Sequence, residues 1–258
     1  MQNLSNLKLE TPALPAGGGN IGGLKGDIAG AGPDGAATLS VPLPASAGRG
    51  FAPSLQLSYH SRAGNSPFGM GWNINVMSIR LRTNKGVPYY DGTDSFVGPD
   101  GEVLVPVMSG GTPEIRQANT LLGEPLGDTF TVHAYRSRIE TDFSRLEHWV
   151  SPSNAATTFW VIYTSDGQVH ILGYQEQARI SHPVVPSQNA VWLIESSVSS
   201  TGEQIFWQYR AEDDTSCSPS EIAAHSDSAA QRYPVAIWYG NKKSGAYSTG
   251  HQCFSNSF

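Results

Sequence analysis

The sequence predicts a mainly β protein, with many short antiparallel strands and hairpins, Gly- and Pro-rich turns, and little helix. Three observations support this fold class. Glycine (28) and proline (17) are abundant in the 258 residues and only 15% of residues are charged, which suits tight turns better than long salt-bridged helices. Apolar and polar residues alternate along several stretches, as in half-buried strands. Turn-forming dipeptides such as Asp-Gly separate those stretches.

The first predicted element is a flexible, Gly-rich N-terminal arm over residues 1–36. Its few large apolar side chains cannot bury enough surface to offset the conformational entropy lost on ordering. A β domain is predicted over 37–241, and it begins with alternating strands at 38–43 and 54–59. Pro42 lies inside the first of these strands, which favours either an edge strand or the end of the strand.

A turn-rich loop is predicted next, over 63–71. It contains three glycines, an asparagine and a proline, which supply the positive and fixed φ angles of tight turns. Phe68 lies within this loop and Trp72 follows it directly. Large aromatic rings would be exposed to water in a free loop. We therefore expect both rings to pack into the core, as a plug that fixes the loop there.

Further strands are predicted through the middle of the chain. A strand is expected within 74–81, followed by a hairpin over 96–105. The stretch 112–128 is expected to be turn-rich with no regular pattern. Alternation resumes over 129–135, and the aromatic content of 143–150 favours a strand over a short helix.

The C-terminal part contains the clearest hairpin, over 159–172, where β-branched and aromatic runs flank an Asp-Gly turn. A second strand-turn-strand unit spans 192–210. An initial proline and several alanines predict a helix of one or two turns within 219–232. A last strand is expected at 235–239. The polar tail over 242–258 is expected to be truncated or disordered, and a chain that ends just after a strand signal suggests a piece of a longer protein.

Composition excludes several classes of protein. The net charge of −6 comes from 16 basic and 22 acidic residues without a long run of either sign, so the basic footprint of a nucleic-acid-binding protein is missing. No apolar run of about 18 residues is present to span a membrane. The N-terminus lacks the features of a Sec signal peptide. Cys217 and Cys253 are either two free or buried thiols or one disulfide.

The histidines form no recognisable metal or catalytic motif. No pair stands at i and i+4 on a predicted helix, and there is no His-Glu-x-x-His sequence. We expect ordinary surface or strand positions for all seven: His60, His133, His148, His170, His182, His225 and His251.

Six acidic residues could suggest a site: Asp91, Asp94, Asp100, Glu140, Glu147 and Glu195. The three aspartates do not follow the ligand spacing of an EF-hand loop, so we expect them to form turns. The three glutamates lie in strand-like runs without a second carboxylate nearby, and we expect them on solvated faces. We therefore assign no catalytic, cofactor-binding or metal-binding residue, and predict that the chain is not an enzyme.

Five segments form an ordered signature: Leu39-Ser-Val-Pro-Leu-Pro44, Gly48-Arg-Gly-Phe-Ala-Pro53, Gly64-Asn-Ser-Pro-Phe-Gly-Met-Gly-Trp72, Gly86-Val-Pro-Tyr89 and Gly98-Pro-Asp-Gly-Glu-Val-Leu-Val105. This signature resembles the N-terminal domain of the Salmonella virulence plasmid B protein (SpvB) family, which also opens the B subunits of insecticidal toxin complexes. The resemblance extends over about residues 12–241. The unit at 192–210 also resembles the tyrosine-aspartate repeats of RHS proteins.

The resemblance implies a partial RHS-like β shell and a non-catalytic role in a secreted toxin. In toxin-complex B subunits this domain forms part of a shell that, with the C subunit, encloses a cytotoxic fragment. A β-propeller that is absent here docks the shell to the A subunit. Such a protein would be cytoplasmic before its release, which would use lysis or a dedicated export system.

Two alternatives remain open. One is the N-terminal delivery domain of an SpvB-like toxin that ADP-ribosylates actin. The NAD-handling Ser-Thr-Ser and Glu-x-Glu motifs of that enzyme are absent from these residues. The other alternative is a carbohydrate-binding β module, in which some of the six tryptophans and ten tyrosines would form stacking platforms.

Overall fold

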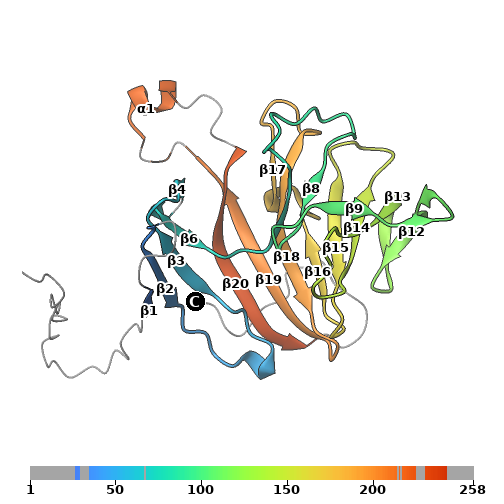
Figure 1. Ribbon diagram of the computed structural model, residues 1–258, viewed down its shortest axis with the longest axis horizontal. Helices are drawn as coiled ribbons and strands as arrows, with labels where there is room; N and C mark the ends of the chain where they lie inside the picture. Colours follow the sequence, from blue (N-terminus) through green and yellow to red (C-terminus); the bar gives the residue numbers. More distant parts are fainter. Residues whose placement is uncertain are drawn as a thin grey trace, which may run out of the picture.

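One large antiparallel sheet organises the molecule. The computed structural model describes residues 27–29, 35–66, 68–213, 215, 217–224 and 230–242. Within them the main path of the sheet runs β12-β13-β14-β15-β16-β18-β19-β20 (Figure 1). These strands are β12 (Ile115–Leu121), β13 (Glu124–Ser137), β14 (Arg145–Val150), β15 (Thr158–Tyr163), β16 (Val169–Leu172), β18 (Asn189–Val198), β19 (Glu203–Ala211) and β20 (Arg232–Lys242). The predicted mainly β fold is confirmed.

Shorter strands extend this sheet at its sides. They are β7 (Ser78–Leu81), β8 (Phe96–Val97), β9 (Leu104–Pro106) and β17 (Arg179–Ser181). Strands β7 and β17 both pair with β18, β8 pairs with β7, and β9 pairs with β13. A separate small hairpin joins β10 (Met108–Ser109) to β11 (Thr112–Pro113).

The centre of the large sheet is buried on both faces, as β15 illustrates. Its residues Thr158 to Ile162 are all buried, so its sequence is a continuous apolar run with no polar alternation. Trp160 and Ile162 point into one core cluster with Leu146 and Trp192. Phe159 and Val161 point into a second cluster on the other face, with Phe130, Val132, Trp149 and Ile171. The sheet therefore carries a hydrophobic core on each side.

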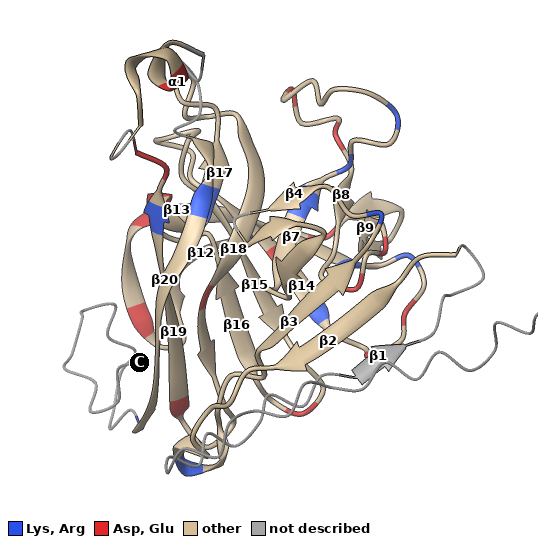
Figure 2. Ribbon diagram, turned by 90° about the vertical axis from the view of Figure 1, so that its left-hand side faces the viewer, with Lys and Arg blue, Asp and Glu red and all other residues tan. Residues whose placement is uncertain are grey.

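A smaller sheet is built from the N-terminal strands, in the order β1 (Asp27–Ala29), β2 (Thr38–Pro42), β3 (Gln56–His60) and β6 (Trp72–Ile74). Figure 2 shows it alongside the large sheet. The predicted strands at 38–43 and 54–59 correspond to β2 and β3. Strand β1 lies inside the predicted N-terminal arm and pairs with β2. Residues 1–26 lie outside the described residues, so a flexible arm stays a prediction.

The segment that follows β2 connects the small sheet to strand β20 of the large sheet. The backbone N–H of Ser46 donates to the Tyr239 hydroxyl of β20 at 2.9 Å. The short 3₁₀ turn Gly48–Gly50 packs against the same tyrosine. Gly48 has a φ of +47°, and a Cβ there would lie 2.5 Å from the Tyr239 ring. Only glycine allows both the conformation and the close approach.

Several predicted hairpins are confirmed. The clearest, at 159–172, corresponds to β15 and β16, and that at 192–210 corresponds to β18 and β19. Around 96–105, Val97 and Val103 form an antiparallel bridge, although β9 then pairs with β13. The stretch 143–150 forms strand β14, as the aromatic content indicated.

The expectation of an irregular stretch over 112–128 is wrong. Most of it forms a second long hairpin, β12 with β13, closed at Leu122 and Gly123. Both residues have positive φ, 51° and 84°, as a tight two-residue turn requires. A leucine rarely adopts that conformation, and β12 is mostly exposed, so neither turn chemistry nor hydrophobic alternation revealed the hairpin.

The plug predicted for the 63–71 loop is wrong for Phe68, which is 40% exposed. Trp72 is half-buried, with its ring centroid 5.2 Å from that of Tyr59 on the neighbouring strand. The loop contains two short strands, β4 (Asn65–Ser66) and β5 (Gly69–Met70), and is closed by backbone and hydroxyl hydrogen bonds. Gly71 N donates to Gly64 O at 3.0 Å, and the Ser66 hydroxyl donates to the Trp72 carbonyl. Polar bonds therefore replace the expected aromatic plug.

The short C-terminal helix has the expected length, whereas the last strand is longer than expected. Helix α1 covers Pro219–Ala224, while 225–229 lie outside the described residues. Strand β20 is longer than the expected 235–239 and pairs with β19 over its length. The tail beyond Lys242 lies outside the described residues as well. Within the described part of the chain, no helix is long and apolar enough to cross a membrane.

Candidate functional site

A cleft between the two sheets is the best candidate for a site. Its volume is about 450 Å³, and both sheets contribute to its walls. The large sheet supplies His170, Ile194, Ser197, Ile205 and Trp207, among others. The segments that flank β3 and β6 supply residues such as Phe51, Leu55, Val76 and Met77. An apolar cleft with few polar groups is the usual form of a small-molecule site.

The polar centre of this cleft is a buried His-Ser pair. His170 on β16 and Ser197 on β18 are direct cross-strand partners, and His170 Nδ1 lies 2.6 Å from the Ser197 hydroxyl. Burial lowers the pKa of His170, partly opposed by the charge of Asp166, so the imidazole is neutral at physiological pH. The Asp166 carboxylate accepts hydrogen bonds from Thr164 and Gln168.

This pair does not form a nucleophilic triad within the described residues. A triad needs a carboxylate that orients the second imidazole nitrogen, and no described carboxylate hydrogen-bonds His170. The pair therefore satisfies two buried polar groups between adjacent strands. Sequence reasoning missed this pair because the two residues are 27 positions apart in the sequence. Only the register of the strands brings them together.

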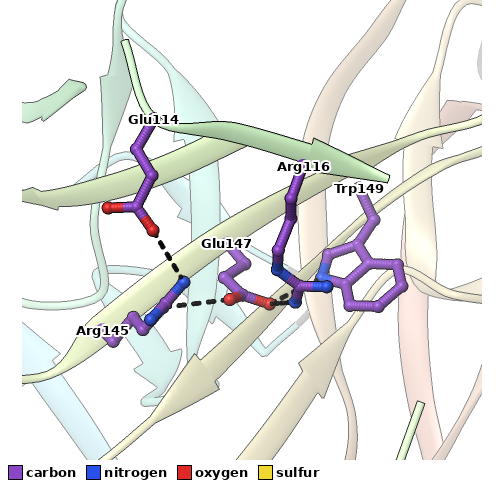
Figure 3. A network of polar contacts seen from close by, with 5 residues as sticks. All are labelled: Glu114, Arg116, Arg145, Glu147 and Trp149. Atoms are coloured by element: carbon purple, nitrogen blue, oxygen red, sulfur yellow. Dashed lines mark hydrogen bonds and ion pairs between the residues drawn. The ribbon is translucent and has the colours of Figure 1, made fainter. Parts of the chain in front are cut away.

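The most organised charged cluster surrounds Glu147 (Figure 3). This side chain is 2% exposed, and its Oε2 accepts from Arg116 Nη2 at 2.8 Å and from Trp149 Nε1 at 3.2 Å. Arg145 Nε lies 3.0 Å from the other oxygen and a second nitrogen of Arg145 reaches Glu114 at 3.1 Å. The Arg116 guanidinium also lies over the Trp149 ring, 5.1 Å from its centroid.

This cluster ties β12 to β14 across β13. Ala134 of β13 is the direct partner of Glu147, and its small side chain leaves room for Arg116 to reach over it. The expectation of a solvated face for Glu147 is wrong, because two arginines and an indole N–H replace the water around the carboxylate. Both oxygens of the carboxylate are engaged by donors of the protein itself, so we interpret the cluster as structural.

Glu195 is half-buried, contrary to the expected solvated face. Burial raises the pKa of its carboxyl to about 7, while a hydrogen bond from Gln175 N at 2.8 Å and the nearby Arg179 oppose the shift. Arg179 itself donates to the carbonyls of Gly173 and Tyr174. Glu140, in contrast, is exposed as expected.

The other histidines that the structure describes are not assembled into a site. His148 stacks on Trp160 with ring centroids 4.6 Å apart, and burial lowers its pKa to about 3, helped by neighbouring His133. His182 Nδ1 accepts from two backbone N–H groups in its own loop. His225 and His251 lie outside the described residues. In the described part of the chain, no three His, Cys, Asp or Glu side chains gather as a metal site would require.

The three aspartates form turns, as predicted. Asp94 accepts from the N–H groups of Tyr89 and Tyr90, and Asp91 accepts from Thr93. Asp100 accepts from the N–H of Glu102 and from the Ser137 hydroxyl. Cys217 is exposed and free, while Cys253 lies outside the described residues.

Comparison with protein families and curated proteins gives a consistent match. The family model described as Salmonella virulence plasmid 65kDa B protein matches residues 31–257. The chain is 42% identical over 231 residues to the mono(ADP-ribosyl)transferase SpvB of Salmonella typhimurium and of Salmonella dublin. The match covers 89% of this chain and 38% of those relatives, so the chain spans well under half of their length.

Solved structures match as well. The crystal structure of TcdB2-TccC3 matches with 52% identity and a TM-score of 0.82, over 96% of this chain and 12% of that chain. A Photorhabdus luminescens Tc holotoxin pore matches with 55% identity and a TM-score of 0.80, over 93% of this chain and 11% of that chain. The N-terminal domain of the effector SpvB from Salmonella typhimurium matches with 42% identity and a TM-score of 0.75, over 81% and 65% of the respective chains.

Proposed function

The chain belongs to the Salmonella virulence plasmid 65kDa B protein family, and from this membership we propose that it is a non-catalytic structural module of a secreted bacterial toxin. It would form part of the β-rich shell of a toxin-complex B subunit. The observation that carries this proposal is the match to TcdB2-TccC3, which extends over 96% of the chain at 52% identity.

The two-sided core supports this role on physical grounds. The wall of a container must keep its shape without help from a bound ligand. Here the central strands are buried on both faces by aromatic and aliphatic side chains, and each strand of the main path is paired with its neighbours. Interiors packed in this way are stiff and resist deformation.

The proposed partners are the other subunits of such a complex. A C-type subunit would close the shell around a cytotoxic fragment, and an A subunit would dock through a propeller that these residues do not encode. The similarity to a Tc holotoxin supports association with toxin subunits. A location outside the cell of origin fits this proposal, since the relatives are toxins.

A second candidate is the delivery domain of an SpvB-like actin-modifying toxin. The 42% identity to the N-terminal domain of SpvB favours it. That match is to the N-terminal domain of SpvB and not to its transferase part, so this role is non-catalytic too. We expect no transfer of label from NAD to actin above a heat-treated control, and labelling above that control would contradict both candidates.

The six tryptophans do not favour the carbohydrate-binding alternative. Trp149, Trp160 and Trp192 are buried, and the other three tryptophans, Trp72, Trp207 and Trp238, are half-buried. A stacking platform needs aromatic faces open to solvent. The tryptophans instead pack the core and the sheet surfaces.

A chimaera tests the shell proposal. This chain would replace the matching segment of TcdB2, and capture of TccC3 by the chimaera would be measured by size-exclusion chromatography. We expect a stable complex that elutes with native TcdB2-TccC3. A folded chimaera that leaves TccC3 unbound would contradict the shell role and favour the delivery domain.

A further inference from the structure

A pocket of about 320 Å³ lies where β7 and β8 approach the end of β13, and three arginines line it. Arg80 belongs to β7, Arg82 follows it directly, and Arg138 follows β13. Figure 2 shows several blue segments near β7, β8 and β9. The sequence contains no basic run, so only the fold gathers these charges.

The guanidinium groups of this pocket are incompletely paired. Among the described residues, neither Arg80 nor Arg82 makes a side-chain hydrogen bond or ion pair. Arg138 lies 3.6 Å from Glu102 Oε2, too far for a hydrogen bond. Glu102 Oε2 is itself buried and has no described hydrogen-bond partner. One carboxylate thus faces three positive charges, on a chain whose net charge is −6.

Two loops that begin at residues lining the pocket carry exposed apolar side chains. The loop between β7 and β8 begins at its rim and carries Val87 and Tyr89, which are 83% and 80% exposed. The loop between β13 and β14 begins at Arg138 and carries Ile139 and Phe143, which are 57% and 76% exposed. Phe143 has a φ of 55°, an uncommon conformation for a bulky residue. Neither loop buries these side chains against the sheets.

We propose that this pocket and its two flanking loops dock an acidic polypeptide segment of a co-assembling subunit. A carboxylate of the segment would lie between Arg80 and Arg82, in the pocket that both residues line. Apolar neighbours of that carboxylate would pack on Tyr89 and Phe143. This inference rests on the proposed function, because it names the chemistry of a partner that the shell would meet.

The combination of groups favours a peptide over a small free anion. Guanidinium groups bind carboxylates and phosphates equally well in geometric terms. A free phosphate would leave the exposed apolar side chains of the two loops in water. A peptide supplies a carboxylate for the arginines and can also cover those apolar side chains. Central arginines and aromatics with a surrounding rim are typical of protein interfaces.

Two capped peptides test the docking site directly. The acidic probe is Ac-ALDELA-NH2, and its isosteric neutral control is Ac-ALNQLA-NH2. By calorimetric titration at low ionic strength, we expect the acidic peptide to bind about tenfold more tightly than the neutral one, since charged hydrogen bonds contribute more than neutral ones. Equal affinity for the two peptides, or binding of orthophosphate without binding of the acidic peptide, would overturn the proposal.

Arginine variants locate the binding to the pocket. We expect Arg82→Gln to weaken binding of the acidic peptide by about tenfold, and Arg80→Gln to act in the same direction. Arg136→Gln is the matched control, because this exposed arginine of β13 does not line the pocket, and it should change the affinity by less than about twofold. Similar losses for all three variants would show a nonspecific charge effect and contradict the site. Circular dichroism would verify the fold of each variant.

The TcdB2 chimaera separates this inference from the proposed function. If the chimaera with native arginines fails to capture TccC3, the shell role fails. If it captures TccC3 and the Arg80→Gln/Arg82→Gln double variant does so equally well, the shell role stands and the docking site is wrong. We expect capture by the native chimaera and at least about tenfold weaker capture by the double variant.

Discussion

Glu147 loses its water on folding and depends on three neighbouring side chains to replace it. Arg116 and Arg145 supply the positive charge, and the Trp149 indole supplies a further hydrogen bond. Both arginines keep about half of their side-chain surface in water, so their own desolvation is partial. The glutamate is therefore the vulnerable member, because losing a partner leaves a buried charge under-compensated.

Arg116→Met tests this assignment. Methionine keeps an apolar stem over Trp149 but removes the guanidinium, so we expect a loss of about 1–3 kcal/mol in the free energy of unfolding. Arg136→Met is the control, since Arg136 is exposed and has no described side-chain partner, and it should cost less than about 0.5 kcal/mol. Urea denaturation measures both. Equal effects would mean that the Glu147 cluster contributes nothing to stability.

His148 predicts a specific dependence of stability on pH. Its folded pKa of about 3 lies below the ordinary value of 6.5, because burial disfavours the charged imidazolium. Between these values the unfolded chain binds a proton that the folded chain does not. Its contribution to stability is therefore present above about pH 6.5 and is lost as the pH falls toward 3.

His148→Phe isolates this effect, since phenylalanine can keep the stack on Trp160 without titrating. We expect the unfolding free energy of the native protein, relative to the variant, to fall by up to about 1.4 kcal/mol per pH unit between about pH 6 and 4. His133 and His170 shift in the same direction but remain in both proteins, so their contributions largely cancel. A pH-independent difference between the two proteins would show that His148 is accessible to water and protons.

At the scale of elements, the contact of the 3₁₀ turn with β20 holds the small sheet against the large one. Gly48 and Gly50 both have positive φ, but a Cβ at Gly48 would meet the Tyr239 ring while one at Gly50 would meet nothing within 4 Å. We expect Gly50→Ala to cost about 1–2 kcal/mol from backbone strain alone. Gly48→Ala should cost about 1–3 kcal/mol more, from the added steric conflict.

Thermal unfolding of the two glycine variants, together with the NMR signals of the Tyr239 ring, measures this difference. Gly48→Ala should shift the Tyr239 signals, whereas Gly50→Ala should leave them in place. If both variants are equally stable, the turn does not hold the sheets together and the small sheet must be fixed elsewhere.

The elements that sequence reasoning found are those in which local signals agree. In the β15–β16 hairpin, β-branched and aromatic runs surround Asp166-Gly167, whose turn chemistry and strand propensity point to one structure. The β12–β13 hairpin was missed because Leu122 adopts a positive φ that its side chain disfavours, and tertiary packing imposes it. Phe68 was misplaced because hydroxyl and backbone bonds, which leave no hydrophobic pattern, close its loop.

The candidate sites depended on long-range register and were largely unpredictable. The pair His170 and Ser197 and the pair Arg116 and Glu147 are 27 and 31 positions apart. Local patterns cannot specify which strands become neighbours, nor which face of a long strand meets which partner. The turn-forming aspartates were predictable because their partners lie within a few residues, as for Asp91 and Thr93.

At the scale of the whole molecule, the packing of the two sheets is the main feature. The large sheet buries a core on each face, the small sheet covers part of one face, and Glu147 is paired inside the protein. The arginine pocket is the surface that we propose for docking. These properties fit the proposed role as a piece of an enclosing structure.

The most direct test of this account is whether the chain can serve as part of a closed container. The TcdB2 chimaera would be assembled with TccC3 and treated with protease, and the survival of the C-terminal fragment of TccC3 would be followed over time by gel electrophoresis. The account predicts that the fragment survives as it does in native TcdB2-TccC3 and is digested only after the complex is denatured. An assembled chimaera whose fragment is digested as fast as in free TccC3 would contradict the claim that this chain forms part of the shell.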